Sequence, residues 1–134
     1  MARTAAAAVK ALGECLVERV FGAAGDRVLV EECLVGREVS VFAFTDGEAM
    51  SPLVAACDYK RAHDGNVGPN TGGMGSYSPP PFWTAKLERE VQERIMAPTV
   101  RALAREGCPY RGVLYGGLML TEDGPQVIWS RAPF

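Results

Sequence analysis

The chain has 134 residues, of which 48% are hydrophobic, and a formal net charge of −2. This length and apolar content predict one folded domain and exclude a disordered chain. The lack of a basic stripe argues against nucleic acid as the main partner, and no stretch is apolar enough for a signal peptide or a membrane span. We therefore expect a cytoplasmic protein that binds neither nucleic acid nor membrane.

The chain opens with a predicted helix over residues 4–21. Thr4 is a good N-cap, alanines of high helix propensity follow it, and apolar residues recur at helical spacing. Gly22 should end this helix. The next apolar run, Val28-Leu29-Val30, predicts a short buried strand.

Two further strands are predicted before residue 57. The alternating pattern over residues 38–45 indicates a strand with both faces largely covered. Asp46-Gly47 is a hairpin turn signal, after which residues 48–55 should return as a third strand. Pro52 interrupts that strand, which favours an edge position or a bulge.

Residues 57–75 are predicted to form a long functional loop. Asp58, Lys60 and Arg61 place charges of both signs at its start, and Gly, Pro and Asn dominate residues 68–75. Such a segment should form no regular helix or strand, and its glycines would let backbone N–H groups approach an anion. A flexible linker and a solvated charge cluster are the alternatives.

The C-terminal half predicts one long helix followed by two strands. The helix should begin after the N-cap Thr84 and run to about Arg105, with Pro98 kinking or splitting it near its middle. Apolar runs over 110–120 and 126–129 predict two strands that pair across a turn. The order of elements indicates an α+β fold, with an antiparallel or mixed sheet and helices packed on one face.

Other polar side chains carry weaker signals. Glu31 and Glu32 would face opposite sides of a strand, so only one could enter a pocket, and Glu38 offers a further carboxylate nearby. A surface ion pair is the alternative for Glu31 and Glu32. His63, the only histidine, has no partner at metal-ligand spacing and should be solvated. The cysteines lack a CxxC pair and should be reduced: Cys15, Cys33, Cys57 and Cys108.

Five stretches carry a specific combined signal. They are residues 28–40, Thr45-Asp46-Gly47, Asp58-Tyr59-Lys60-Arg61, residues 68–79 with Gly68-Pro69-Asn70-Thr71-Gly72-Gly73-Met74-Gly75, and residues 110–119. Together they closely resemble the phosphoribosylamine–glycine ligase (glycinamide ribonucleotide synthetase) family of ATP-grasp enzymes. The resemblance implies a partial ATP-grasp fold. Residues 1–52 would then belong to the smaller ATP-binding subdomain and hinge, and residues 53–134 to the larger subdomain.

The resemblance also implies a reaction and its site residues. In that family ATP and Mg (or Mn) activate glycine as glycyl phosphate, which 5-phosphoribosylamine attacks in de novo purine synthesis. Catalytic roles would fall to Asp58, Lys60 and Arg61. ATP would be contacted by Glu31, Cys33, Leu34 and Glu38. The substrate and phosphate loop would comprise Asn70, Thr71, Gly72, Gly73, Met74 and Gly75.

Departures from the family pattern lead to further expectations. The family's opening domain and a phosphate-binding lysine would lie upstream of Met1. After Ile128 the chain lacks the Glu and Asn that hold magnesium in the family, and instead reads Trp129-Ser130-Arg131-Ala132-Pro133-Phe134. We therefore expect no metal ligands in this chain, dependence on missing upstream and downstream segments, and an inactive isolated chain. A non-catalytic nucleotide-binding module and an inert product are the alternatives.

The abrupt switch after Ile128 predicts a frameshift or a truncated gene product. Sequencing the encoding locus tests this hypothesis, because neighbouring frames should then encode the missing motifs. Smaller departures affect the expected substrate contacts: Cys57, Tyr59, Asn66 and Val67.

Overall fold

The computed structural model describes residues 2, 4–65 and 67–131. They form two compact units that divide between Cys33 and Leu34. Asn66 and residues 132–134, where departures from the family pattern are expected, lie outside the described residues. Within the described part, no helix combines the length and the apolarity that crossing a membrane requires. The predicted subdomain boundary near residue 52 stays a prediction.

The first unit contains helix α1 (Ala5–Leu16) and a short 3-10 turn, η1 (Gly22–Gly25). Thr4 caps α1 as predicted, because its Oγ1 accepts a hydrogen bond from the backbone N–H of Ala7 at 3.1 Å. The helix ends at Leu16, so the prediction that it continues to residue 21 is wrong. Arg19 adopts a φ of +53°, which a right-handed helix cannot accommodate.

The predicted strand at Val28-Leu29-Val30 is also wrong. These residues have no regular secondary structure, and Leu29 and Val30 are 79% and 78% exposed. A short apolar run becomes a buried strand only where another strand pairs with it, and the described residues provide none here.

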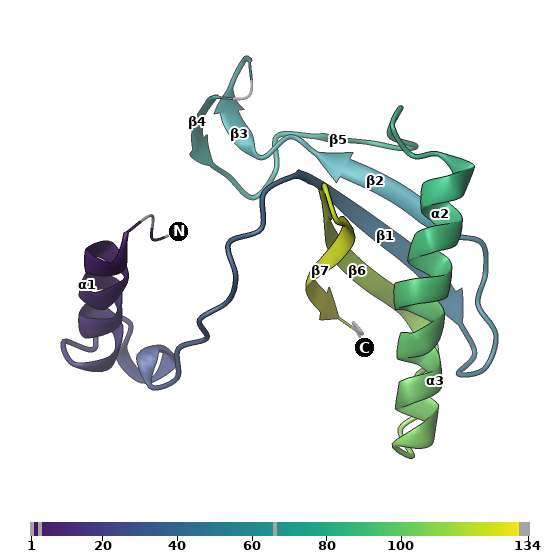
Figure 1. The fold of residues 1–134 in the computed structure, drawn as a ribbon, viewed down its shortest axis with the longest axis horizontal. Helices are drawn as coiled ribbons and strands as arrows, with labels where there is room; N and C mark the ends of the chain where they lie inside the picture. The colour runs from purple at the N-terminus through teal and green to yellow at the C-terminus, as the bar shows by residue number, and fades with distance from the viewer. Residues whose placement is uncertain (1, 3, 66, 132–134) are drawn as a thin grey trace. The chain divides into compact units, whose positions relative to one another are not determined.

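The second unit is a five-stranded sheet with helices on one face, which confirms the predicted α+β class (Figure 1). Its strand order is β5-β2-β1-β6-β7, and every described pair is antiparallel. The strands are β1 (Arg37–Thr45), β2 (Val54–Asp58), β5 (Ser76–Tyr77), β6 (Gly112–Thr121) and β7 (Gly124–Arg131). The helical segments are α2 (Ala85–Val91), the π-helical η2 (Gln92–Met96) and α3 (Ala97–Arg105).

The core lies between the sheet and these helices. Every second residue of β1 is buried, from Val39 to Ala43, and packs with Met96 and Val100. The other face of β1 is less covered than predicted, since Glu38, Ser40 and Phe42 are half-buried and Phe44 is 70% exposed. We call this side the open face, and its residues on β1, β2 and β6 are Glu38, Ser40, Phe42, Phe44, Val54, Ala56, Asp58, Val113, Tyr115, Gly117 and Met119.

The turn after β1 is confirmed, but the next strand begins later than predicted. Asp46 Oδ1 accepts hydrogen bonds from the N–H groups of Glu48 and Ala49 at 2.9 and 2.8 Å, and these bonds lower the pKa of Asp46. β2 starts at Val54, beyond Pro52. Because proline has no N–H for a ladder, pairing resumes only after it.

The long C-terminal helix is divided near Ala97, as predicted. Thr84 caps α2, with its Oγ1 accepting from Leu87 N at 3.2 Å. Pro98 lacks the N–H that would close an α-turn, and the wider π-turns of η2 directly precede α3. Gly107, at φ +76°, follows the end of α3.

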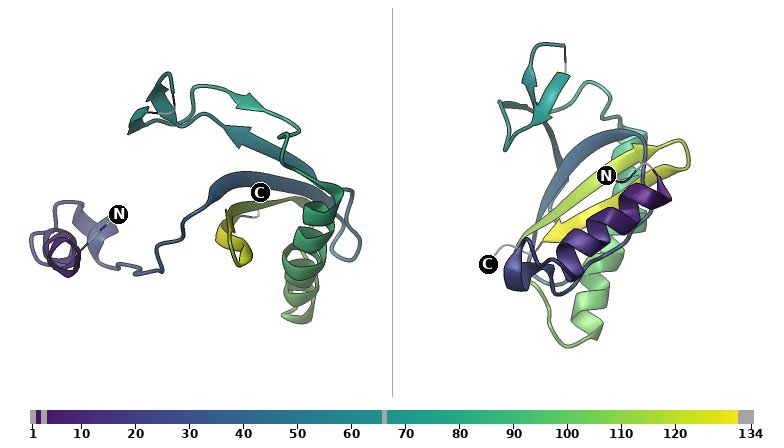
Figure 2. Two further views of the ribbon diagram at one scale, coloured as in Figure 1. Left: turned by 45° about the horizontal axis from the view of Figure 1, so that its top comes forward. Right: turned by 90° about the vertical axis from the view of Figure 1, so that its left-hand side faces the viewer.

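Residues 57–75 contain a β-hairpin rather than a loop without regular structure. β3 (Arg61–His63) pairs antiparallel with β4 (Val67–Asn70), and the hairpin projects beyond the end of β2 (Figure 2). The prediction that residues 68–75 form no strand is therefore wrong for residues 68–70. A two-stranded ribbon tolerates Gly and Pro because both of its strands are edges.

Candidate functional site

A charged cluster lies at one end of the open face, where β1 begins and β2 ends. Lys60 Nζ forms a hydrogen-bonded ion pair with Glu38 Oε1 and lies 4.0 Å from Asp58 Oδ1. The three side chains are 34–35% exposed. Glu38 and Asp58 reach the same face because each lies an even number of residues from the register pair Ser40 and Ala56.

The environment of Lys60 favours its charged form. Partial burial acts to lower the pKa of Lys60, but the hydrogen bond and charge of Glu38 and the charge of Asp58 outweigh it. The pKa of Lys60 is therefore raised above its usual value. A phosphate or carboxylate of a ligand would bind this ammonium group in competition with Glu38.

The predicted substrate loop folds directly onto this charged segment. The N–H of Tyr59 donates to the Gly75 carbonyl at 2.9 Å, and the N–H of Met74 donates to the Tyr59 carbonyl at 2.8 Å. The Lys60 carbonyl accepts from the backbone N–H of Thr71 at 2.7 Å. These bonds bring the backbone of the glycine loop beside Lys60, and they argue against a flexible linker.

Arg61 is the predicted catalytic residue whose described contact lies away from the cluster. Its Nη1 donates to the Gly68 carbonyl at 2.6 Å, across the β3–β4 hairpin. His63 contacts the same glycine, because a Cβ on Gly68 would lie 2.6 Å from its ring. The guanidinium therefore ties the hairpin together.

The predicted ATP-binding residues are divided between the two units. Glu31 and Cys33 belong to the first unit and lie in its exposed C-terminal segment. Leu34 begins the second unit, to which Glu38 also belongs. Of this set, Glu38 is the residue that the structure brings together with Asp58 and Lys60.

Two hydroxyl residues on the open face were missed by the sequence reasoning. Ser40 Oγ and the Tyr115 hydroxyl lie 3.1 Å apart, and the Tyr115 ring packs on Phe42 with 5.1 Å between ring centroids. Ser40 could have been found from the two-residue period of β1, since it follows Glu38 on the same face. Tyr115 had no such signal, because its strand was read only as an apolar run.

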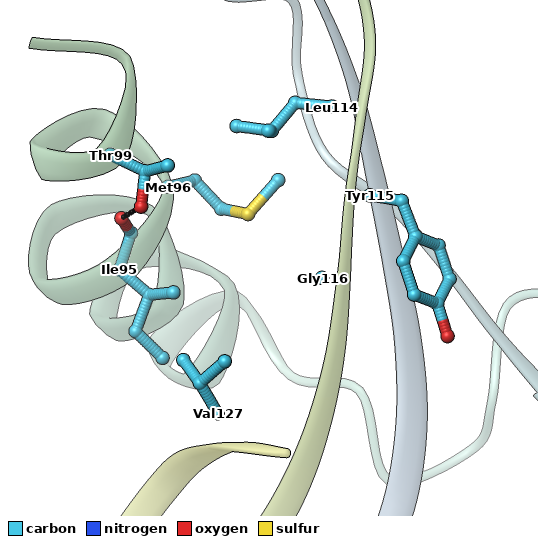
Figure 3. A pocket seen from close by; sticks show the side chains of 7 residues that line it. All are labelled: Ile95, Met96, Thr99, Leu114, Tyr115, Gly116 and Val127. Atoms are coloured by element: carbon cyan, nitrogen blue, oxygen red, sulfur yellow. Dashed lines mark hydrogen bonds between the residues drawn. The ribbon is translucent and has the colours of Figure 1, made fainter. Parts of the chain in front are cut away.

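The helical side of the sheet holds a small apolar pocket of about 40 Å³. Figure 3 shows Met96, Ile95 and Leu114 on one side of β6, with the Tyr115 side chain on the other. The lining residues are Ile95, Met96, Thr99, Leu114, Tyr115, Gly116 and Val127. The pocket thus lies on the opposite side of the sheet from the charged cluster and offers no charged group.

The described residues do not fit a magnesium or manganese site. Across residues 2, 4–65 and 67–131, no three His, Cys, Asp or Glu side chains gather as a metal-binding group. Glu38 and Asp58 are the nearest to such a group, and the Lys60 ammonium lies beside both. What the arrangement offers a ligand is one ammonium group shared with two carboxylates, with a glycine-rich backbone alongside.

Comparison with solved structures defines the class of protein. The phosphoribosylamine–glycine ligase of Thermotoga maritima is 35% identical and matches with a TM-score of 0.66, over 78% of this chain and 26% of that chain. The fold is therefore a partial ATP-grasp fold, as predicted. The family model "Phosphoribosylglycinamide synthetase, ATP-grasp (A) domain" matches residues 1–133. The chain belongs to this family.

Relatives from bacteria and from a vertebrate support the same family assignment. The phosphoribosylamine–glycine ligase of Caldanaerobacter subterraneus subsp. tengcongensis is 51% identical over 87% of this chain and 28% of its own length. That of Halalkalibacterium halodurans is 52% identical over 95% of this chain and 30% of its own. The trifunctional purine biosynthetic protein adenosine-3 of Gallus gallus is 49% identical over 90% of this chain and 12% of its own length. The chain thus spans less than a third of the length of each.

Proposed function

We propose that this chain is part of an ATP-dependent ligase that joins glycine to 5-phosphoribosylamine in purine synthesis, through a glycyl phosphate intermediate. The observation that carries the proposal is Lys60, ion-paired with Glu38 on the open face and bonded through its carbonyl to Thr71. Phosphoryl transfer needs positive charge held at the transferred group and aligned substrates, and Lys60 would supply that charge by exchanging its Glu38 partner for a phosphoryl oxygen. Family membership and the names of the relatives support the choice of substrates.

Within this proposal each group has a distinct task. Lys60 binds phosphoryl oxygens, Asp58 accepts a hydrogen bond from a substrate amine, and Glu38 meets the ribose of ATP. The loop of Asn70, Thr71, Gly72, Gly73, Met74 and Gly75 offers backbone N–H groups to the substrate. Arg61 supports that loop through the hairpin, and Glu31, Cys33 and Leu34 contact adenine. ATP supplies the phosphoryl group when bound.

A chimaeric enzyme tests the role of Lys60. Residues 34–128 of this chain would replace the matching segment of the Caldanaerobacter ligase, and ligation would be followed by ADP release. We expect activity in the chimaera and a loss of about 10²- to 10³-fold on Lys60→Ala, as for other groups that stabilise transition-state charge. Lys86→Ala, on the exposed surface of α2, is the matched control. Full activity in the Lys60→Ala chimaera would contradict the proposal.

The isolated chain should show no ligase turnover, because its described residues present no metal-binding group. Turnover near that of a full-length relative, with ATP, glycine and phosphoribosylamine, would contradict this expectation. The second candidate is a non-catalytic nucleotide-binding module, favoured by the intact Lys60 cluster. Calorimetry distinguishes it from an inert chain: weak ATP binding that is lost on Glu31→Ala supports binding, and no heat supports the inert chain.

A further inference from the structure

We infer that the Ser40 hydroxyl binds a phosphoryl oxygen of the nucleotide beside Lys60, and that Tyr115 positions Ser40 for this contact. The inference rests on the proposed function, because it takes the ligand of the open face to be ATP. It adds two residues on neighbouring strands, β1 and β6, to the charged cluster.

The register of β1 and β6 explains why the two hydroxyl groups meet. Tyr115 pairs with Phe42, and Ser40 pairs with Gly117, so Ser40 and Tyr115 are diagonal neighbours on one face. Gly117 contributes no side chain, which leaves the Tyr115 ring room to extend towards Ser40. The ring packs on Phe42 at an interplanar angle of 60°, and its hydroxyl lies 3.1 Å from Ser40 Oγ.

The hydroxyl pair lies close to the ammonium group of the cluster. Ser40 follows Glu38 by two residues on the same face of β1, a rise of about 6.7 Å along a strand. Glu38 in turn holds Lys60 in an ion pair. On the other side of Ser40, its β2 partner Ala56 carries only a methyl group. A ligand oxygen over Ser40 would thus lie next to the ion pair of Glu38 and Lys60.

The hydrogen-bonding capacity of a hydroxyl group determines the separate roles of Ser40 and Tyr115. A hydroxyl group has one hydrogen to donate and two lone pairs. When Tyr115 donates to Ser40, the Ser40 hydrogen is directed to a third group, and an oxygen anion next to a lysine is the matched acceptor. Tyr115 then acts through Ser40 and is a positioning residue.

The test is a double-mutant cycle on the full chain, with Kd measured by calorimetry for ATP, inorganic triphosphate and adenosine. Ser40→Ala should weaken ATP and triphosphate about tenfold, since a hydrogen bond to a charged group is lost. Tyr115→Phe should weaken both by a smaller factor. The double variant should bind no more weakly than Ser40→Ala alone, because Tyr115 acts through Ser40. Adenosine, which lacks phosphate, should bind all variants equally.

Two controls separate binding from folding. Ser40→Thr keeps the hydroxyl and should restore wild-type binding, and Lys86→Ala, on the exposed surface of α2, should leave it unchanged. Unchanged ATP binding in Ser40→Ala overturns the inference and leaves the proposed function standing. Equal weakening of adenosine also overturns it, because the hydroxyls would then contact the nucleoside. Failure of the wild-type chain to bind ATP and triphosphate overturns both this inference and nucleotide binding by the isolated chain.

Discussion

Lys60 and Thr71 are joined by two hydrogen bonds to one atom. The Lys60 carbonyl oxygen accepts from the Thr71 backbone N–H at 2.7 Å and from Thr71 Oγ1 at 3.0 Å. The same Oγ1 accepts from the N–H of Gly73 at 3.1 Å. A single threonine hydroxyl therefore connects the charged segment after β2 to the glycine loop, and this contact places the proposed substrate loop beside the proposed phosphate-binding lysine.

Thr71→Val should loosen the loop while keeping the shape of the side chain. The substitution removes both bonds made by Oγ1, and we expect a loss of about 1 kcal/mol in local stability. Amide hydrogen exchange at Gly73 should become faster, whereas the core strand β1 should exchange as before. Thr71→Ser keeps the hydroxyl and is the matched control. Slow exchange at Gly73 in Thr71→Val would show that the hydroxyl does not hold the loop.

The ion pair between Glu38 and Lys60 predicts a change in titration. Glu38→Gln removes the charge that most raises the pKa of Lys60, so this pKa should fall towards or below its usual value. Asp58→Asn should lower it less, since Asp58 lies 4.0 Å away. NMR titration of the Lys60 side chain measures both. A larger drop in Asp58→Asn than in Glu38→Gln would reverse the assignment of the dominant partner.

The same pair predicts how stability depends on pH. The pKa of Lys60 is higher in the folded chain than its ordinary value, so the folded state holds this proton more tightly. The contribution is fully present below the unfolded pKa of about 10.4 and is lost as pH rises through the folded pKa. Urea unfolding between pH 9 and 11 should therefore show a smaller loss of stability in Glu38→Gln than in the wild type. If stability fell equally with pH in both proteins, Lys60 would not be the source of this pH dependence.

The β3–β4 hairpin offers a matched pair of glycines. Gly65 (φ +75°) and Gly68 (φ +88°) both lie in the left-handed region, so alanine costs roughly 1 kcal/mol at either position. A Cβ at Gly65 meets open space, but at Gly68 it would lie 2.6 Å from the His63 ring. Gly68→Ala should therefore disturb the hairpin more than Gly65→Ala, as measured by backbone chemical shifts and amide exchange.

A second substitution isolates the cause of that difference. Adding His63→Ala to Gly68→Ala removes the ring and should reduce the perturbation to that of Gly65→Ala. If the double variant stays as perturbed as Gly68→Ala alone, the clash with His63 is not the reason, and the backbone angle at Gly68 carries the whole effect.

Residues that form structure through local chemistry were predictable from the sequence. Thr4 and Thr84 cap helices through their own hydroxyls, and Asp46 closes its own turn. The β1 strand followed from its alternating pattern. The strand predicted at Val28 does not form, because an apolar run becomes a strand only when a distant strand pairs with it. The sequence around Val28 does not show whether such a partner strand exists.

The candidate site was predictable in its residue types but not in its geometry. The charges of Asp58 and Lys60 are visible in the sequence, but their pairing with Glu38 depends on the antiparallel register of β1 and β2. Tyr115 lies more than seventy positions after Ser40, and only the pairing of β1 with β6 brings the two hydroxyls together. A catalytic role for Arg61 stays a prediction, and the sequence did not show that its Nη1 donates to Gly68 across the hairpin.

Two substitutions at the pocket beside η2, Met96→Ala and Gly116→Ala, should change the free energy of unfolding in opposite directions. Met96 is 2% exposed and packs in the core, so Met96→Ala should enlarge the pocket and cost about 2–5 kcal/mol. Met74→Ala, at a position 63% exposed, should change stability by about 0.5 kcal/mol or less. Gly116→Ala places a Cβ 3.4 Å from Met96 Sδ, within ordinary packing distance.

That new methyl group fills part of the pocket and also restricts the unfolded chain. Gly116→Ala should therefore stabilise the chain by about 0.4–1 kcal/mol. Urea denaturation of the three variants measures these free energies of unfolding directly. A destabilised Gly116→Ala would mean that the Met96 side chain does not adjust to a methyl group at this contact, and that the pocket beside it is too rigid to be filled from the strand side.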